Sequence, residues 1–294
     1  MHQTESFITS SRPKSASNAG DRLETEFFKE YTSQEAISKY TRATAGYGIS
    51  YLLDHDYKEV YLDALDLLSD QAKKRGLRIL EFGCGGGMNL LHLRSVLGRQ
   101  GVRVEQAIGT DFSPVLIEAA QRDAKNFLGQ EQLQRLEFHQ AKNESLLADL
   151  SAALKKDESQ LRGAFDFIFG VNTIRYCHDA GKELDCARDI FDLLAPGGVC
   201  VVIDMNNRFP LFRSDLNNRL RRIREEECYV ASLEEYAEPF IKTGFKVERK
   251  EHFCWVPHSS GKFLCTITRL LSPLLNVVAP SRAMRALVVA RKPS

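Results

Sequence analysis

The residues ILEFGCGGGMN, 79–89, place an apolar strand pattern directly before a loop with glycine at four of five positions. Gly83 permits a tight turn with positive φ, and Gly85 and Gly87 lack the Cβ atoms that would hold a ligand away from the backbone. In open α/β sheets, ligands bind beyond the carboxyl ends of the strands, beside the loop after the first strand. The loop at 83–87 is therefore the first candidate binding site.

A carboxylate follows the next strand pattern, where QAIGTDFS ends in Asp111, Phe112 and Ser113. An acid in this place can accept hydrogen bonds from both ribose hydroxyls of a nucleoside, and the neighbouring phenyl ring offers an apolar face to a purine. Ser113 and Pro114 suit the N-cap and first position of a helix. A lone Asp at a strand end fits a turn or cap equally well, so the nucleoside hypothesis depends on the loop and the acid together.

The glycine spacing narrows the ligand class. It reads G-x-G-x-G, whereas the dinucleotide fingerprint G-x-G-x-x-G requires a glycine at the position of Met88. A Walker A phosphate loop is excluded because no Lys-Ser or Lys-Thr pair follows the glycines. The remaining structural alternative is a glycine loop that only permits a tight strand-to-helix turn.

Strand and helix patterns alternate from residue 77 onward. The strand candidates are RILEFG, VEQAIGTDF, LQRLEFHQA, FDFIFGVN, VCVVIDMN, FKVERKEHFCWV and RALVVARK. Amphipathic helical segments separate the first five, which is the signature of repeated βαβ units and predicts a parallel sheet covered on both faces. Ser232 and Glu235 form a capping box before the sixth candidate.

Residues 23–76 have a helical pattern and precede this alternation. Thr32 and Glu35 fit a capping box, and apolar and aromatic residues then recur at three-to-four spacing. We expect Gly46 and Gly48 to divide this run into separate helices. The segment is interpreted as a helical cap on a larger domain.

The runs ILEFGCGGG, GTDFSPVLIEAA, FDFIFGVNTIRYCHD and LLAPGGVCVVID resemble successive motifs of the class I S-adenosylmethionine-dependent methyltransferases, over roughly Leu77 to Asp204. The resemblance implies an α/β fold: a Rossmann-like, seven-stranded, mostly parallel sheet with helices on both faces, here with the N-terminal helical cap. The antiparallel seventh strand, inserted at one edge, would be RALVVARK. The methyltransferase domain would span 77–294, with a substrate-binding insertion around 255–285.

The resemblance also implies S-adenosylmethionine as cofactor and S-adenosylhomocysteine as product. This cofactor carries an amino acid and a sulfonium in place of a pyrophosphate, so it needs close backbone approach without a phosphate cradle. Many family members have an acidic GDA-like segment after the third strand, but this chain reads HQAKNESL, in which Lys142 is expected to face solvent. The cofactor-binding residues that we expect are Tyr40, Glu81, Gly83, Cys84, Gly85, Asp111 on the ribose, Phe112 on the adenine, Ser113, Asn143 on the adenine amino group, and Asn172.

The segment after the fourth strand, GVNTIRYCHD, faces the cofactor in this family and supplies the catalytic candidates, His178 and Tyr176. Methyl transfer from a sulfonium is an in-line displacement, in which orienting the reactants can supply effective molarities of about 10⁵–10⁸ M. A base is needed only if the acceptor must lose a proton, and His178 would then serve near neutral pH. The alternative, in which His178 and Asp179 only end a turn and cap the next helix, stays open.

Substrate contacts are expected from the cap, from the segment after the fourth strand and from the insertion. Tyr40 and Tyr47 lie seven residues apart and would share one helix face if the helix continues to Gly46. Aromatic packing between cap and sheet is the alternative for the tyrosines, and contact with the cap helices is the alternative for Trp255. The predicted substrate residues are Tyr47, Tyr51, Arg175, Trp255 and His258.

Composition limits the partners. The formal net charge of +1 over 294 residues argues against bulk attraction to nucleic acid or anionic membranes, although a local basic patch is compatible with that sum. The run FLCTITRLLSPLLNVVAP is interrupted by Arg269 and Pro273, so no membrane span is expected. GVNT stands where amino-methylating nucleic-acid enzymes carry an Asp/Asn-Pro-Pro-aromatic run, which favours a small-molecule substrate and no nucleic acid. The oligomeric state is left open.

Cysteine usage and the first residues predict the compartment. Seven cysteines are scattered without a C-x-x-C pair, which indicates reduced thiols and a cytoplasmic protein. Residues 1–22 contain no apolar core of a secretory signal and have the Ser, Asn, Gly and Pro content of a disordered tail. Asp204 alone does not supply the carboxylate cluster of a metal-assisted mechanism, so no metal is expected.

The leading hypothesis from the sequence is S-adenosylmethionine-dependent methyl transfer to a small-molecule acceptor by in-line displacement. One alternative is a nicotinamide dinucleotide-dependent oxidoreductase, against which Met88 in the place of the third glycine argues. The other is a catalytically inactive module that binds S-adenosylmethionine.

Overall fold

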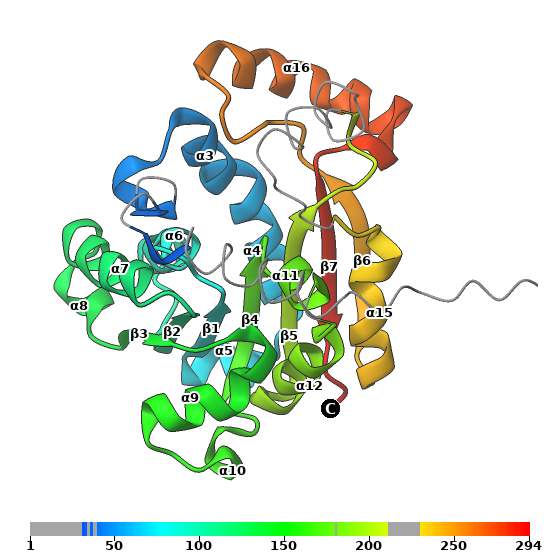
Figure 1. Ribbon diagram of the computed structural model, residues 1–294. Helices are drawn as coiled ribbons and strands as arrows, with labels where there is room; N and C mark the ends of the chain where they lie inside the picture. The colour runs from blue at the N-terminus through cyan, green and yellow to red at the C-terminus, as the bar shows by residue number, and fades with distance from the viewer. Residues whose placement is uncertain (1–30, 34–35, 38–39, 180, 211–229) are drawn as a thin grey trace, which may run out of the picture.

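Seven strands form one sheet in the order β3-β2-β1-β4-β5-β7-β6 (Figure 1). This computed structural model describes residues 31–33, 36–37, 40–179, 181–210 and 230–294. Strands β1 to β5 pair in parallel, and β7 pairs antiparallel with both of its neighbours. The strands are β1 (Leu77–Phe82), β2 (Val104–Asp111), β3 (Leu136–Gln140), β4 (Phe165–Val171), β5 (Leu194–Met205), β6 (Lys246–Phe253) and β7 (Arg285–Arg291). The predicted Rossmann-like fold is confirmed, with β7 one strand inside the edge that β6 forms.

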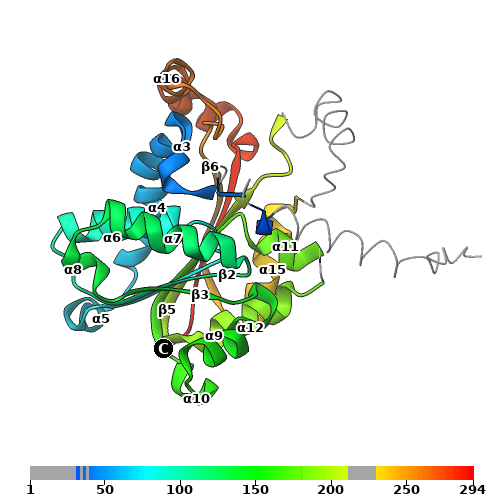
Figure 2. The ribbon, with the colours of Figure 1, turned by 60° about the vertical axis from the view of Figure 1, so that its left-hand side comes forward.

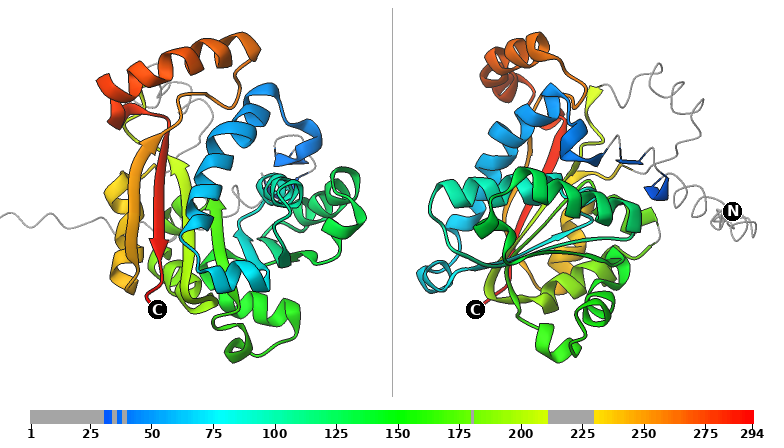
Figure 3. Two further views of the ribbon diagram at one scale, coloured as in Figure 1. Left: turned by 180° about the vertical axis from the view of Figure 1, so that it is seen from behind. Right: turned by 90° about the vertical axis from the view of Figure 1, so that its left-hand side faces the viewer.

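Helices cover both faces of the sheet, as Figures 2 and 3 show. The segments between the strands are α6 (Met88–Arg99), α7 (Pro114–Phe127), α8 (Gln130–Leu133), η3 (Asn143–Ser145), α9 (Leu146–Leu154), α10 (Glu158–Leu161), α11 (Ile174–Asp179), α12 (Glu183–Leu193) and α15 (Leu233–Thr243). Side chains of α6 and α7 pack in one core cluster, and those of α9, α12 and α15 pack in the other. Because both faces of the sheet are buried, the strand sequences are nearly continuous runs of apolar residues.

The helix before β6 begins as its capping box predicts. Ser232 Oγ accepts a hydrogen bond from the Glu235 amide at 3.3 Å, and Glu235 Oε2 accepts one from the Ser232 amide at 2.7 Å. These reciprocal bonds satisfy two amides that the first turn of a helix leaves without partners.

The N-terminal helices pack into the same core as the sheet. They comprise η1 (Arg42–Thr44), α3 (Tyr47–Leu52), a π-helical turn η2 (Leu53–Tyr57), α4 (Lys58–Asp66) and α5 (Asp70–Arg75). Tyr61 is fully buried, with its ring centroid 4.9 Å from that of Phe169 on β4. Thr32 lies in the described part of the chain, but its predicted capping partner Glu35 lies outside it. The division into tail, cap and domain stays a prediction.

The two cap glycines have different roles. Gly46 is the N-cap of α3 and ends the preceding run, as predicted. Gly48 lies inside α3, so the prediction that it breaks the helix is wrong. A Cβ at Gly48 would lie 2.5 Å from the carbonyl oxygen of His258, because α3 runs directly against that loop. Tyr40 and Tyr47 consequently do not share one continuous helix, since η1 and Gly46 separate them.

The predicted insertion lies between β6 and β7 and contains α16 (Lys262–Val278) and η4 (Pro280–Arg282). Figure 1 shows α16 across the top of the molecule, beside α3. Pro273 lies within this helix without ending it. As the interruptions in its sequence predict, none of the helices in the described ranges is long and apolar enough to cross a membrane.

We expect Gly48→Ser to destabilise the protein, because its Cβ would meet backbone oxygen atoms of His258, Pro257 and Ser260 within 2.9 Å. Overpacking of this kind costs about 1–3 kcal/mol, or roughly 2–10 °C in unfolding midpoint. Gly46→Ser is the matched control, since nothing lies within 4 Å of its added Cβ and serine is a good N-cap. Thermal unfolding of both variants measures the difference, and equal midpoints would contradict the close contact.

Candidate functional site

The loop between β1 and α6 has a left-handed backbone at alternate residues. The φ angles are +61° at Gly83, +53° at Gly85 and +76° at Gly87. Other residues adopt such angles only at a cost, so the backbone itself requires the G-x-G-x-G spacing. The Cys84 amide donates to the Thr110 carbonyl at 2.8 Å, which fixes the loop against the end of β2.

Two glycines of the loop make room for the protein's own chain. A Cβ on Gly86 would lie 2.4 Å from the Tyr40 carbonyl oxygen, and one on Gly83 would lie 2.3 Å from Thr173 Cγ2. Gly85 is less crowded, since the nearest atom to its added Cβ is Tyr40 Cβ at 3.6 Å. The loop is therefore where the N-terminal segment and the segment after β4 meet.

Asp111 joins the end of β2 to this loop. Its Oδ2 accepts a hydrogen bond from the Gly85 amide and its Oδ1 one from the Ser113 amide, both at 2.9 Å. Each carboxylate oxygen keeps a second lone pair for a ligand hydroxyl. Burial raises the pKa of Asp111 to about 6, against the opposite effect of the two amide donors. The structure thus brings together three of the predicted cofactor residues.

The buried side chains of Glu81 and Cys84 support the glycine loop. The Glu81 carboxylate is fully buried and accepts from the Leu90 amide at 2.9 Å and from Asn89 Nδ2 at 3.2 Å, which ties β1 to the first turn of α6. Burial raises the pKa of Glu81 well above its ordinary value. Burial also raises the pKa of Cys84, whose Sγ lies 3.0 Å from the Cβ position of Gly109. Asn89 was not singled out, although it stands in the quoted motif.

Two buried oxygen atoms beside Gly83 have no hydrogen-bond partner within the described part of the chain. They are Asn143 Oδ1, from η3, and Thr173 Oγ1, from the segment after β4. Such atoms are costly unless a ligand or water satisfies them. Asn143 was predicted to contact an exocyclic amine, and its free acceptor fits that task; Lys142 faces solvent as expected. Thr173 was missed, although it directly follows Asn172 in the motif.

An aromatic cluster of Tyr31, Tyr40, Phe112 and Tyr176 lies beside Asp111. The Tyr31 ring centroid lies 5.1 Å from that of Tyr40, 5.9 Å from that of Phe112 and 5.9 Å from that of Tyr176. Tyr40 OH donates to Tyr31 OH at 3.1 Å, and the hydroxyls of Tyr31 and Tyr176 are 2.6 Å apart. Ser113 Oγ donates a hydrogen bond to the Tyr31 carbonyl oxygen at 2.6 Å. Tyr31 is a tyrosine of the predicted cap segment, but it was not among the predicted cofactor or substrate residues.

Arg175 links this cluster to a buried carboxylate. Its Nη2 donates to Tyr176 OH at 2.8 Å, and its Nε lies 3.8 Å from Asp204 Oδ1. Asp204 is fully buried at the end of β5, and burial raises its pKa despite the nearby guanidinium groups. Arg175 and Tyr176 are therefore joined at the edge of the site. The side chain of His178 lies outside the described residues, so its predicted role as a base stays a prediction.

A second guanidinium, that of Arg285, is buried at the start of β7. Its Nη1 donates to Asn172 Oδ1 at 2.8 Å, and its Nη2 contacts the ring nitrogens of His258. No carboxylate in the described ranges lies within ion-pair distance of Arg285, whose side chain is fully buried. Burial and the charges of Arg285 and Arg175 hold the pKa of His258 well below its ordinary value. Arg285 was missed, although a charged residue opening the apolar run RALVVARK was its signal.

Three predicted substrate residues lie away from the glycine loop. Tyr47 is exposed, and the Tyr51 ring centroid lies 4.5 Å from that of His55. Trp255 Nε1 donates to Asn276 Oδ1 of α16 at 2.7 Å, so the indole anchors the insertion.

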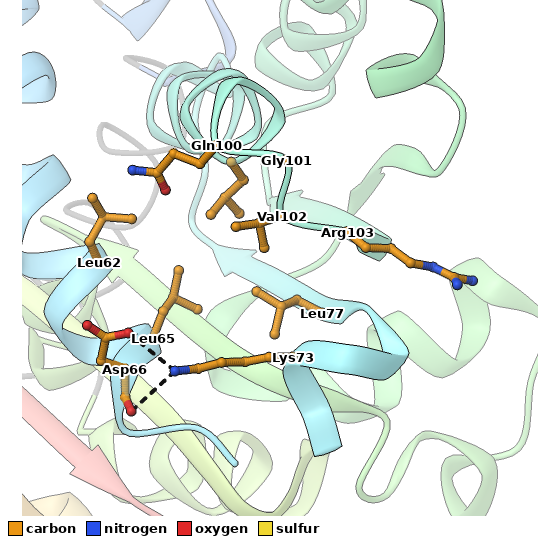
Figure 4. A pocket seen from close by; sticks show the side chains of 10 residues that line it. Leu62, Leu65, Asp66, Lys73, Leu77, Gln100, Gly101, Val102 and Arg103 are labelled. Atoms are coloured by element: carbon orange, nitrogen blue, oxygen red, sulfur yellow. Dashed lines mark hydrogen bonds and ion pairs between the residues drawn. The ribbon is translucent and has the colours of Figure 1, made fainter. Parts of the chain in front are cut away.

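A cavity of about 440 Å³ opens at the opposite end of β1 (Figure 4). It lies between α4, α5 and the turn before β2, and Lys73 Nζ donates to Asp66 Oδ1 at 3.2 Å beside it. Leu77, the first residue of β1, lines this cavity, whereas the glycine loop follows the last residue. It is therefore separate from the candidate site.

Residues 53–250 match the sequence profile of a family described as a methyltransferase domain. The chain belongs to this family and is a class I S-adenosylmethionine-dependent methyltransferase. The match includes the glycine loop, Asp111 and the segment after β4. S-adenosylmethionine is the cofactor that membership implies, and the orphaned Asn143 oxygen, the bare glycines and the accepting carboxylate fit it.

The methyltransferase is similar in sequence to a ubiquinone biosynthesis O-methyltransferase of Caulobacter sp. (strain K31). The two are 29% identical over 134 residues, which are 45% of this chain and 42% of that protein. The similarity therefore spans less than half of either protein.

Solved structures share the fold at low sequence identity. An S-adenosylmethionine-dependent methyltransferase from Mesorhizobium loti aligns with a TM-score of 0.52 and 18% identity, over 82% of this chain and all of that chain. The [4+2]-cyclase SpnF aligns with a TM-score of 0.52 and 17% identity, over 81% of each chain. The CMeT domain of the citrinin polyketide synthase aligns with a TM-score of 0.53 and 17% identity, over 89% of this chain and 58% of the other.

We expect S-adenosylhomocysteine binding to weaken as the pH falls through 6, since the raised pKa means that Asp111 is an ionised acceptor only above about 6. Below that pH, the dissociation constant should rise by up to about tenfold per unit. Isothermal titration between pH 5 and 8 measures this. Asp111→Asn should bind weakly with little pH dependence, and a wild-type affinity unchanged down to pH 5 would contradict the assignment.

Proposed function

We propose that this methyltransferase transfers the methyl group of S-adenosylmethionine to a small-molecule acceptor by in-line displacement. The observation that carries the proposal is the Asp111 carboxylate bonded to the Gly85 amide at 2.9 Å, beside the unpartnered Asn143 oxygen. An acceptor for the ribose hydroxyls, a loop backbone that a ligand can approach closely, and an acceptor for an exocyclic amine therefore lie in one place. That combination matches the three parts of an aminoacyl nucleoside.

The predicted cofactor residues divide into contacts and supports. Gly83, Gly85, Asp111, Phe112 and Asn143 would contact the cofactor. The Glu81 carboxylate accepts a hydrogen bond from the first turn of α6, and Ser113 bonds both Asp111 and Tyr31. Cys84 fills the space behind the loop. The Tyr40 carbonyl accepts a hydrogen bond from the Gly86 amide at 3.1 Å. In this arrangement the supports fix the loop before the ligand arrives, which lowers the entropic cost of binding.

Tyr176 and Arg175 are the proposed acceptor-side pair. When bound, the cofactor supplies a methyl group on a positively charged sulfur, and the protein's task is to orient the acceptor against it. The Tyr176 hydroxyl accepts a hydrogen bond from Arg175 at 2.8 Å, and its ring lies 4.8 Å below the guanidinium carbon. A neighbouring cation stabilises negative charge on a phenol. Tyr176 could thus orient an acceptor hydroxyl and, as a phenolate that has first released its own proton to solvent, take up the acceptor's proton.

The acceptor end of the site has an excess of buried positive charge. Among the described residues, Arg285 donates to the neutral Asn172 amide and contacts the His258 ring, while the buried acid Asp204 lies beside Arg175. A buried charge is stable when a counter-charge and hydrogen bonds satisfy it. We therefore propose an acceptor with a carboxylate or another anionic group. The name of the Caulobacter relative favours oxygen as the methylated element.

Two other functions remain as alternatives to methyl transfer. An oxidoreductase would require a pyrophosphate site that the glycine spacing does not provide. The other alternative is a cofactor-binding protein without methyl transfer; the [4+2]-cyclase SpnF, which has the same fold, is a precedent for a different reaction on this fold. We keep the cytoplasm as the proposed compartment, supported by six buried free cysteines.

The test of the proposal is incubation of the enzyme and a metabolite extract with methyl-labelled S-adenosylmethionine. A labelled acidic product, retained on an anion exchanger, is expected. Tight cofactor binding without any labelled product would favour the inactive module or a cyclase, and tight NADH binding would favour the oxidoreductase.

Tyr176→Phe should lower kcat by roughly 10²-fold, the lower range for loss of a proton-transfer group, without a change in S-adenosylhomocysteine affinity. Tyr236→Phe is the control, because Tyr236 lies on α15 and its hydroxyl accepts a hydrogen bond from the Ala231 amide beside the same helix. Steady-state kinetics with the identified acceptor measure the effect. Unchanged kcat in Tyr176→Phe would show that its hydroxyl takes no part.

Arg285→Met should raise the KM for the acceptor by at least about tenfold, because the anion would lose its buried counter-charge. Arg285→Lys, which keeps the charge, should recover part of this loss. S-adenosylhomocysteine affinity provides the folding control for both variants. An unchanged KM in a folded Arg285→Met variant would contradict the anionic acceptor.

A further inference from the structure

Helix α16 exposes an unusual amount of apolar surface. Of the ten large hydrophobic side chains that are exposed in the described residues, seven belong to this helix. They are Phe263, Leu264, Leu270, Leu271, Leu274, Val277 and Val278. Contiguous apolar surface on a soluble domain marks an interaction site, whereas isolated exposed side chains need no explanation.

The apolar face of α16 points to solvent. Phe263, Leu270, Leu274 and Val277 follow one another at spacings of seven, four and three residues, which places them on one side of the helix. They are 80%, 75%, 61% and 80% exposed. Cys265, on the opposite side, is fully buried. The amphipathic pattern is therefore inverted relative to a helix that packs on its own core.

Contacts with the rest of the fold fix this orientation. Trp255 Nε1 donates to Asn276 Oδ1 at 2.7 Å, and Cys265 packs in a core cluster of the sheet. Figures 1 and 2 show the helix at one extreme of the molecule, with its outer side clear of other described elements. A broad surface can therefore approach α16 along its length without meeting the rest of the described fold.

The charged side chains of α16 and of the segment that follows it have one sign. The sequence contains no Asp or Glu after Glu251, and Lys262, Arg269 and Arg282 are exposed on or next to α16. Such a combination of apolar stripe and cations is complementary to a surface with an apolar interior and anionic groups at its boundary.

We propose that α16 docks the enzyme on an anionic lipid membrane, lying in the plane of the interface with Phe263, Leu270, Leu274 and Val277 inserted. A helix of 17 residues is about 25 Å long, too short to span the bilayer and suited to lie in the interface. A second copy is a poorer occupant, since one helix face offers roughly 300–500 Å², below the ~800 Å² per partner of a stable interface.

Docking in this way orients the candidate site toward the lipid. The insertion that contains α16 leaves the sheet after Phe253 and returns at Arg285, which pairs with Met205 at the carboxyl end of β5. The carboxyl ends of the parallel strands, where the glycine loop lies, thus face the same side as α16. The proposal rests on the surface of α16 alone and is independent of the acceptor.

The test is co-sedimentation of the full chain with vesicles of phosphatidylcholine, with and without phosphatidylglycerol. The wild type should bind the vesicles that contain phosphatidylglycerol, and Leu270→Glu/Leu274→Glu should bind them at least tenfold more weakly. Ile241→Glu on α15 is the matched control, because Ile241 is 56% exposed on another helix and should retain binding. Lys262→Glu/Arg269→Glu should lose the preference for the anionic lipid.

Thermal unfolding and S-adenosylhomocysteine binding establish that each variant is folded. Absence of wild-type binding to anionic vesicles, or equal loss in Ile241→Glu, would overturn the proposal. Sedimentation velocity tests whether α16 instead binds a second copy of the chain. If the wild type is a dimer that does not bind vesicles, and Leu270→Glu/Leu274→Glu is a monomer, this face would be assigned to a second copy.

Discussion

The hydrogen bond from the Gly85 amide to the Asp111 carboxylate is the interaction on which the site depends. It connects the loop after β1 to the end of β2, and it forms only because the parallel pairing places Phe82 opposite Thr110. The left-handed backbone at Gly83, Gly85 and Gly87 is needed to turn the chain within five residues. An added Cβ or a changed register would therefore disturb the loop, the acid and the start of α6 together.

Electrostatics divides the carboxyl edge of the sheet into two parts. Over β1 and β2, the buried carboxyl groups of Glu81 and Asp111 accept hydrogen bonds from backbone amides, and burial raises the pKa of both. Over β4, β5 and β7, two guanidinium groups lie near one buried acid, Asp204. The first part suits the neutral hydroxyls of a ribose, and the second suits an anion. Such a division lets the two ligands of a methyl transfer be recognised by different chemistry.

The fold alone does not decide the reaction. The [4+2]-cyclase SpnF aligns with this chain as well as the Mesorhizobium loti methyltransferase does, with a TM-score of 0.52 in both cases. The sheet supplies a carboxyl edge, while the inserted segments supply the chemistry at that edge. Here these are the N-terminal segment with Tyr31, the turn after β4 and the insertion before β7. We propose that their side chains select what is bound beside the cofactor.

The sequence by itself determined the sheet, the glycine loop and Asp111, because these depend on local requirements: alternating strand and helix patterns, positive φ and an acid at a strand end. Only the tertiary structure decided which distant side chains meet. Arg285 meets Asn172, which is 113 residues earlier, and His258, which is 27 residues earlier. The close approach of the His258 loop leaves no room for a Cβ at Gly48, and Tyr31 contacts Tyr176. The outward face of α16 also depends on packing, since an amphipathic pattern specifies an apolar side but not whether core or solvent lies against it.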